Sequence, residues 1–501
     1  MSDQEYNLSD PIFEWAQRTP HAAAIIEGDQ HLDYAGLCNA VRRAAHRFRD
    51  AGWNPGDIVG VSIRGRETLH LVIALALARI GVIQVTLSPN ELAAARLSLA
   101  QTLGVRATVC DHAHDRLSGI AHLAAHDDWL SEGPTLPVAA DIRAAGGDRA
   151  WMVLESSGTT AVPKNIRNSH HFHRIVAERF DPVFGVSPGE RVASLTGFRF
   201  RMGLSRALYC LSQGGTFVTV PRALTPTQLL HWINASRIDS LNSVPTHLFA
   251  LLEDPVGDAP RLPGMRILRC SGGALPVSAV HRIREQLTPN LYLAYGTNEV
   301  GSISAATPAI LDRYPDSVGL PFSGIELEIV DEAGRPVPAG TVGHIRVRGA
   351  GIDSSALLGS AQLEQAAFRQ GWFYPGDTAS VNREGMIFLK GRSDEVLNFD
   401  GILIGPLEIE AAVARHPAVA EVAAFALPSP RHQDVPAAAV VLKYPLPLEE
   451  LHRYCAELLG IRAPREYFVI DAIPKSPIGK VLRRRLVELA LAHIKTRNKP
   501  V

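Results

Sequence analysis

The segment from Ser156 to Lys164 concentrates residue types that bind polyphosphate. It follows the apolar run Trp151 to Leu154, which predicts a strand, and it combines hydroxyls, a glycine and one lysine. Exposed N–H groups, hydroxyl donors and a cation offset phosphate charge. The alternative is a polar turn with a solvated lysine, and the spacing is not that of a Walker loop. We expect phosphate contacts from Ser156, Ser157, Gly158, Thr159, Thr160 and Lys164.

Further short motifs whose residues could take part in binding or catalysis follow along the chain. Taken singly, each has an ordinary explanation: a Gly-Gly turn, a solvated carboxylate, a turn aspartate, a charged linker, or a surface lysine in a basic tail. The strings are Gly272-Gly273-Ala274, Tyr295-Gly296-Thr297-Asn298-Glu299, Gly371 to Asp377, Arg392-Ser393-Asp394 and Pro474 to Lys480. Their joint occurrence in this order is far less probable than any single match, and it favours one shared function.

Together these strings resemble the motifs of the adenylate-forming superfamily, which includes acyl-CoA synthetases, amino-acid adenylation domains and beetle luciferases. The resemblance covers nearly the whole chain, since Phe13 to Leu87 also looks like the N-terminal half of that family. It implies an acid–thiol ligase that uses ATP to convert a small aryl or short acyl carboxylic acid into its acyl-AMP. Pyrophosphate leaves, and the acyl group then passes to the thiol of coenzyme A.

The resemblance also implies roles for individual residues around the nucleotide. Gly273 and Ala274 would lie beside adenine and the acyl group. Gly296, in the next motif, would also contact the nucleotide. Tyr295 would pack on adenine, and Glu299 would help to hold Mg²⁺, a hard cation suited to carboxylate oxygen. Asn298 stands where a threonine usually contacts the α-phosphate, and its amide can still donate a hydrogen bond.

The remaining roles concern the ribose, the hinge and catalysis. Asp377 would accept both ribose hydroxyls, and Arg392 would contact ribose or phosphate. Asp394 would be the hinge about which a small domain rotates. Lys480 would bridge the carboxylate and the α-phosphate, because lysine carries a compact charge on a long stem. Lys164 would be the second catalytic lysine.

Four positions depart from the family pattern. Ala161 and Asn165 replace glycines, which reduces backbone freedom in the phosphate loop. Asn298 and Pro375 replace threonines. Ala161, Asn165 and Asn298 leave open a catalytically weak homologue that binds acyl ligands or nucleotides.

The segment from Leu195 to Gly203 resembles the family's acyl pocket. Phe200 stands where a histidine or aromatic residue is usual, and Gly272 and Thr297 would complete the pocket. An α-amino acid is disfavoured, because no aspartate occurs between Asp181 and Asp239. Arg199 and Arg201 are unusual there: they are either surface residues or partners for a second carboxylate or polar oxygen of the substrate.

The acceptor is less defined than the acid. Acyl ligases of this family often carry a basic residue before the glycine of a second hinge string, and Asp400 occupies that position here. Transfer to the phosphopantetheine arm of a carrier protein therefore remains an alternative to coenzyme A.

Composition excludes several other classes. The 501 residues are 46% hydrophobic and carry a formal net charge of −1, so no global field favours nucleic acid. Five widely spaced cysteines suggest neither a zinc site nor disulfides, which is typical of a cytoplasmic protein. The N-terminus lacks the pattern of a signal peptide. The most apolar stretch, Leu69 to Leu87, contains His70, Arg79 and Gly81 and is not expected to span a membrane.

Helix and strand patterns alternate from Asp10 to Leu87 and again from Trp151 to about Ala306. This alternation predicts an α/β fold in which helices flank mostly parallel sheets. After Ser317, short strands with glycine turns predict a β-barrel-like or antiparallel subdomain. We expect a large adenylate-forming domain at 1–392 and a small, mobile α+β domain at 393–501.

Overall fold

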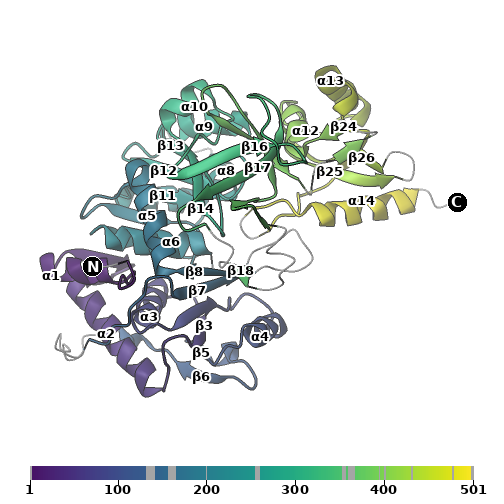
Figure 1. The fold of residues 1–501 in the computed structure, drawn as a ribbon. Coiled ribbons are helices and arrows are strands. Elements are labelled where there is room, and N and C mark those ends of the chain that lie inside the picture. Colours follow the sequence, from purple (N-terminus) through teal and green to yellow (C-terminus); the bar gives the residue numbers. More distant parts are fainter. Residues whose placement is uncertain are drawn as a thin grey trace.

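The computed structural model describes residues 3–130, 141–155, 165–198, 200–253, 260–352, 357–358, 367–393, 395, 397–399, 402–429, 433–476 and 479–497. These residues form helix-flanked sheets, and the predicted α/β class is confirmed (Figure 1). In this view most of the purple and blue N-terminal residues lie low, the teal and green residues lie above them, and the C-terminal segment lies at the right.

The first sheet has the strand order β18-β8-β7-β4-β3-β5-β6 in the described residues, and its β7-β4-β3-β5-β6 portion is parallel. Antiparallel β8 and β18 close one edge. The bounds are β3 Ile58–Ser62, β4 Ile83–Thr86, β5 Ala107–Cys110, β6 Ala121–Ala124, β7 Ala150–Glu155, β8 Asn165–Ser169 and β18 Leu357–Leu358.

The second sheet has the order β15-β14-β13-β12-β11-β9-β10-β1-β2, and it is parallel from β13 to β1. Its carboxyl edge holds several of the motif residues. The bounds are β1 Ala23–Glu27, β2 Gln30–Asp33, β9 Arg191–Ser194, β10 Thr216–Val218, β11 Ser240–Ser243, β12 Ile267–Ser271, β13 Leu291–Thr297, β14 Gly301–Ala306 and β15 Leu320–Pro321.

Helices cover these two sheets. Every residue of α3 from Thr68 to Arg79 is buried, as expected of a helix that is apolar on all sides. No helix of the described chain is both long and apolar enough to cross a membrane. The bounds are α1 Asp10–Arg18, α2 Tyr34–Asp50, α3 Glu67–Arg79, α4 Ala93–Thr102, α5 His170–Phe184, α6 Arg201–Ser212, α7 Pro226–Ala235, α8 Pro245–Glu253, α9 Val277–Gln286 and α10 Pro308–Arg313.

The antiparallel subdomain predicted after Ser317 corresponds to a third sheet, in which β16 pairs antiparallel with β17. Its path is β19-β20-β17-β21-β22. This sheet brings the start of β21 opposite the end of β22. The bounds are β16 Ile325–Val330, β17 Gly343–Gly349, β19 Phe368–Arg369, β20 Trp372–Phe373, β21 Asp377–Val381 and β22 Ile387–Arg392.

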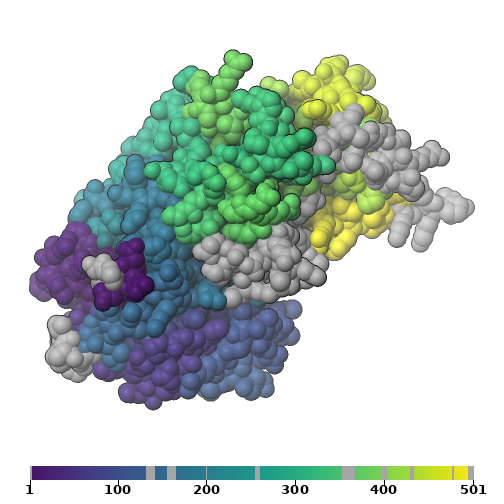
Figure 2. Space-filling view, viewed as in Figure 1, coloured from purple at the N-terminus to yellow at the C-terminus, as the bar shows by residue number. Residues whose placement is uncertain are grey.

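The C-terminal segment forms its own sheet and core, with the order β24-β23-β26-β25 and β27 paired to β26. Figure 2 shows its yellow residues as a lobe at one end of the molecule. Helix α12 ends at Val413, shortly before Pro417, which disfavours helical backbone at the residue before it. The bounds are β23 Leu397–Phe399, β24 Ile402–Ile404, α12 Pro406–Val413, β25 Val419–Ser429, β26 Gln433–Leu442, α13 Leu448–Leu459, β27 Glu466–Val469 and α14 Arg483–Arg497.

All five cysteines are free and buried, in agreement with the absence of disulfides expected from their spacing.

Candidate active site

One cavity of about 2330 Å³ is lined by residues of the second and third sheets and of the C-terminal segment. It brings together all the predicted site residues that the structure describes. These are Phe200, Gly272, Gly273, Ala274, Tyr295, Gly296, Thr297, Asn298, Glu299, Asp377, Arg392 and Lys480. Residues separated by up to 280 positions thus share one space, and their individual roles stay predictions.

Several predicted site residues lie outside the described residues. They are Ser156, Ser157, Gly158, Thr159, Thr160, Lys164, Arg199 and Asp394. The segment predicted to bind phosphate lies between β7 and β8 in the sequence, and both strands belong to the first sheet.

The turn between β13 and β14 carries Asn298 and Glu299 to the cavity. Gly296 permits this turn, because a Cβ there would lie 2.1 Å from the carbonyl oxygen of Gly301. The Thr297 hydroxyl accepts a hydrogen bond from Val300 N at 3.3 Å. The half-buried Glu299 carboxylate at this cavity edge suits a hard divalent cation, which takes one or two carboxylates together with phosphate oxygens.

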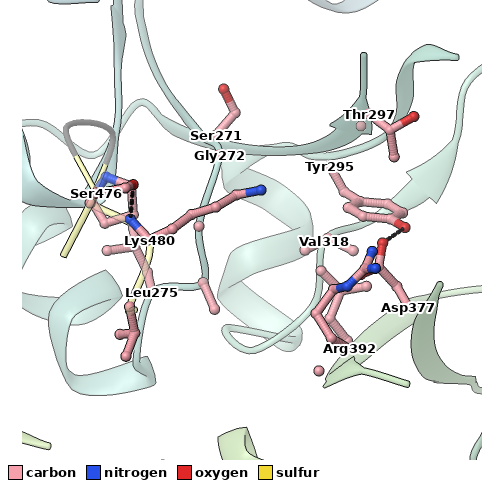
Figure 3. Close-up of a pocket in the computed structure, with 18 of the residues that line it drawn as sticks. Ser271, Gly272, Leu275, Tyr295, Thr297, Val318, Asp377, Arg392, Ser476 and Lys480 are labelled. Carbon is pink, nitrogen blue, oxygen red and sulfur yellow. Dashed lines mark hydrogen bonds and ion pairs between the residues drawn. The ribbon is translucent and has the colours of Figure 1, made fainter. Parts of the chain in front are cut away.

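Tyr295 and Asp377 meet across the cavity, although 82 residues separate them. The tyrosine hydroxyl donates to Asp377 Oδ2 at 2.5 Å, and the close-up shows the two side chains in contact (Figure 3). Burial, followed by the charge of Asp377, raises the pKa of Tyr295 well above its usual value. The hydroxyl therefore remains a donor at working pH.

Arg392 lies beside this pair because β21 and β22 place Asp377 and Arg392 opposite each other. Its Nη1 is 3.5 Å from Asp377 Oδ1 and donates to the carbonyl of Pro375 at 2.6 Å. Gly376 has φ +80°, and a Cβ there would lie 2.8 Å from Arg392 Nη2. The glycine of the Gly-Asp string therefore makes room for this arginine.

The Gly-Gly string follows β12 directly. Gly272 has φ +85°, which a side chain would strain. A Cβ on Gly273 would lie 3.2 Å from Pro245 Cγ at the start of α8. The two glycines thus turn the chain past α8 and leave backbone, without side chains, at the cavity wall.

Arg201 begins α6, directly after Phe200. Its Nη1 donates to the carbonyl of Asn298 at 2.8 Å, next to Glu299. Burial lowers the pKa of Arg201 to about 10, and the nearby charge of Glu299 opposes that shift. The arginine that the sequence offered as a substrate contact is thus bonded to the turn that presents Asn298 and Glu299.

Lys480 reaches the cavity from the C-terminal segment. Its loop is closed by Ser476, whose hydroxyl accepts from Lys480 N at 3.1 Å and whose own N–H donates to the Lys480 carbonyl at 2.7 Å. Figure 3 shows the Lys480 side chain extending into the pocket, with the Tyr295–Asp377 pair on the far side. The loop also touches α8: a Cβ on Gly479 would lie 2.6 Å from Thr246 Cγ2.

Two residues of the cavity were not identified from the sequence. Arg269, in β12, lines the cavity and is only 9% exposed, and an arginine inside an otherwise apolar strand was the available signal. Thr246 receives the Lys480 loop, and nothing in its local sequence distinguishes it.

With this geometry in place, comparison with known proteins defines the class. Residues 12–354 match the AMP-binding enzyme family, and residues 408–480 match the AMP-binding enzyme C-terminal domain. Because the first match alone covers more than half of the chain, the protein belongs to the AMP-binding enzyme family.

Among curated relatives, 4-chlorobenzoate–CoA ligase from Arthrobacter sp. is 27% identical over 95% of this chain and 94% of its own. The 2-succinylbenzoate–CoA ligase of Bacillus subtilis (strain 168) is 26% identical over 95% and 96%. Among solved structures, o-succinylbenzoate CoA synthetase from Bacillus subtilis, bound to its acyl-adenylate intermediate, aligns with a TM-score of 0.85 at 24% identity. That alignment covers 95% of this chain and 97% of the other, and it shows the fold.

Proposed function

We propose that this protein is an ATP-dependent acid–thiol ligase. It converts a small aryl or short acyl carboxylic acid into the acyl-AMP and then transfers the acyl group to coenzyme A. The observation that carries the proposal is the shared cavity. In it, Lys480 from the C-terminal segment faces a cluster of Tyr295, Asp377 and Arg392, which come from the second and third sheets. Relatives named CoA ligases along nearly the full length support the same assignment.

In the first half-reaction, a carboxylate oxygen attacks the α-phosphorus of ATP, and pyrophosphate leaves with the electrons of the broken P–O bond. The reaction needs aligned reactants and neutralised charge more than it needs covalent catalysis. Asp377 accepts the ribose hydroxyls, with Arg392 beside it. Lys480 offsets the negative charge that builds up on the α-phosphate and the carboxylate. Lys164 and the hydroxyls of the phosphate loop hold the departing phosphates.

A magnesium ion fits the carboxylate of Glu299, which lines the cavity and is half-buried. Bound there, it would neutralise charge on the phosphates. Arg201 keeps Glu299 in place by fixing the carbonyl of the preceding Asn298 at 2.8 Å.

In the second half-reaction, the sulfur of coenzyme A attacks the acyl carbonyl, the thiol proton is lost, and AMP leaves. Lys480 comes from the C-terminal segment and extends into the same cavity, so we propose that residues 393–501 rotate about Asp394 between the two steps. Such gating by a domain hinge is a common device. The free, buried cysteines suit a reducing compartment, and we place the enzyme in the cytoplasm.

The test is acid-dependent exchange of labelled pyrophosphate into ATP, measured over a panel of aryl and short acyl acids. Reactions that give exchange are repeated with coenzyme A and, separately, with a phosphopantetheine-loaded carrier protein, and the thioester is identified by mass spectrometry. Exchange followed by acyl-CoA formation is the expected result. Thioester formation on the carrier protein alone would show that the carrier protein, and not coenzyme A, is the acceptor. Nucleotide binding without exchange would identify a non-catalytic homologue.

A further inference from the structure

Arg269 is a buried cation in the wall of the cavity. It lies in the middle of β12, is only 9% exposed and lines the cavity. Arginine keeps its charge at any ordinary pH. A buried charge is costly unless an anion and hydrogen bonds compensate it.

A polar network fixes the orientation of Arg269. The neighbouring strand β11 places Asn242 in register with it, and Arg269 Nη1 donates to Asn242 Oδ1 at 3.2 Å. The Asn242 amide nitrogen in turn donates to the hydroxyls of Ser194 at 3.1 Å and Thr196 at 3.2 Å. Because the amide nitrogen serves those hydroxyls, the amide oxygen is left to hold the guanidinium.

Aromatic rings hold the same group from another side. The guanidinium carbon of Arg269 lies 4.5 Å from the ring centroid of Phe180 and 5.2 Å from that of Phe184. Ring faces attract a cation but carry no net charge. The rings therefore position the guanidinium and leave its charge uncompensated.

No carboxylate of the described residues pairs with Arg269. Burial, and then the like charges of Arg206 and Arg201, lower the pKa of Arg269 to about 9. Its Nε is buried without a hydrogen-bond partner, and Nη1 has only the bond to Asn242. The guanidinium is thus pre-oriented, charged and short of acceptors.

The neighbouring buried arginine differs in this respect. Arg206 donates from Nη2 to the hydroxyl of Ser240 at 2.8 Å and from Nη1 to the carbonyl of Phe184 at 3.3 Å. Arg206 thus has structural partners, as Arg201 has in Asn298. Arg269 stands apart as the cavity arginine that a ligand would complete.

We infer that the acid activated by this enzyme carries a second carboxylate, which Arg269 binds in the cavity while the first carboxylate reacts. A guanidinium fork matches the two oxygens of a carboxylate in geometry and charge. The inference rests on the proposed function, since it concerns the acid that would occupy the same cavity. It names the substrate class as dicarboxylic acids.

The first test compares matched acids on the full-length enzyme by pyrophosphate exchange. Benzoate is compared with its ortho, meta and para dicarboxylates, and butyrate and valerate with succinate and glutarate. The kcat/KM of at least one diacid should exceed that of its monoacid counterpart by about tenfold or more. A tenfold ratio corresponds to the free energy of about one charge-assisted hydrogen bond. Equal or better use of every monoacid by the wild-type enzyme would overturn the inference and leave the proposed function intact.

The second test uses Arg269→Met and Arg269→Lys. The Met variant should lose roughly ten- to hundredfold in kcat/KM for the preferred diacid while its monoacid rate changes little. The Lys variant should retain part of the preference, because the charge remains without the fork. Arg313→Met is the matched control, since Arg313 is 67% exposed in a surface pair with Glu384.

Equal losses for both acids in the Lys variant would contradict a substrate contact and identify Arg269 as structural. If the Met variant fails to fold, the Lys variant and the wild-type acid series decide the question. If none of the acids supports pyrophosphate exchange, the proposed function is wrong, and this inference falls with it.

Discussion

Replacing Asp377 by alanine perturbs a contact that the structure defines on both sides. The Tyr295 hydroxyl donates to Oδ2 at 2.5 Å, and Arg392 Nη1 lies 3.5 Å from Oδ1. In the proposed complex, the same carboxylate accepts the two ribose hydroxyls of ATP. The substitution therefore removes ribose contacts and also leaves a buried tyrosine hydroxyl without its acceptor.

The two consequences have different magnitudes. Hydrogen bonds to a charged group contribute about 1.5–3 kcal/mol each, so even one lost ribose contact raises the KM for ATP about tenfold. The orphaned Tyr295 hydroxyl adds a loss of folding stability of about 1–3 kcal/mol. Asp377→Ala should therefore impair both nucleotide affinity and thermal stability.

Tyr295→Phe separates these effects. It removes the hydroxyl and leaves the Asp377 carboxylate to meet the ribose. The double variant Tyr295→Phe/Asp377→Ala has no orphaned hydroxyl, so it should recover part of the stability lost in Asp377→Ala. Its KM for ATP should stay high.

The assay is pyrophosphate exchange at varied ATP, paired with a thermal melt of each variant. An unchanged KM for ATP in Asp377→Ala would refute the ribose assignment. Full recovery of ATP affinity in the double variant would show that the single variant acted only through misfolding around Tyr295.

Three further predictions concern catalysis, the cavity and pH. Lys480→Ala should slow adenylation by about a hundred- to thousandfold but should still make thioester from supplied acyl-AMP at a near-normal rate. Asp394→Pro should adenylate normally but transfer the acyl group poorly, because it stiffens the hinge. Equal damage to both half-reactions in both variants would contradict domain rotation. Arg201→Met frees the turn at Asn298, so it should weaken exchange with every acid and raise the magnesium requirement, and a change in acid preference alone would instead favour direct substrate contact. Burial and a neighbouring carboxylate raise the pKa of Glu67 to about 8, so the folded state binds a proton more tightly than the unfolded state. The free energy of unfolding should therefore fall as the pH rises from about 4.5 to about 8. Thermal melts of Glu67→Gln over the same pH range should show a smaller fall.

The sequence predicted much of the fold because its periodicities are strong. The helix and strand alternation predicted from Asp10 to Leu87 and the antiparallel subdomain predicted after Ser317 correspond to observed elements, among them helix α2 and the β16–β17 pair. Strand β11 carries only a weak apolar signal, because Ser240, Asn242 and Ser243 are polar although the whole strand is buried. Ser240 accepts a hydrogen bond from Arg206 in α6, Ser243 donates to the carbonyl of Arg269, and Asn242 bonds to Ser194. Local composition does not reveal such pairing.

The motif residues were predictable for a different reason, since they follow a pattern whose order alone indicates a shared site. The structure adds what spacing cannot contain. The Tyr295–Asp377 bond and the packing of Gly479 on Thr246 join segments that lie far apart in the sequence. Arg269 became significant only when its burial and the lack of a described carboxylate partner were visible.

The central claim is that the acid's own carboxylate attacks the α-phosphorus of ATP. Oxygen-18 in the carboxylate of a substrate acid tests it directly, with mass spectrometry of the products after complete turnover with coenzyme A. One labelled oxygen is expected in AMP and none in pyrophosphate. Label in inorganic phosphate, with ADP as the nucleotide product, would contradict it.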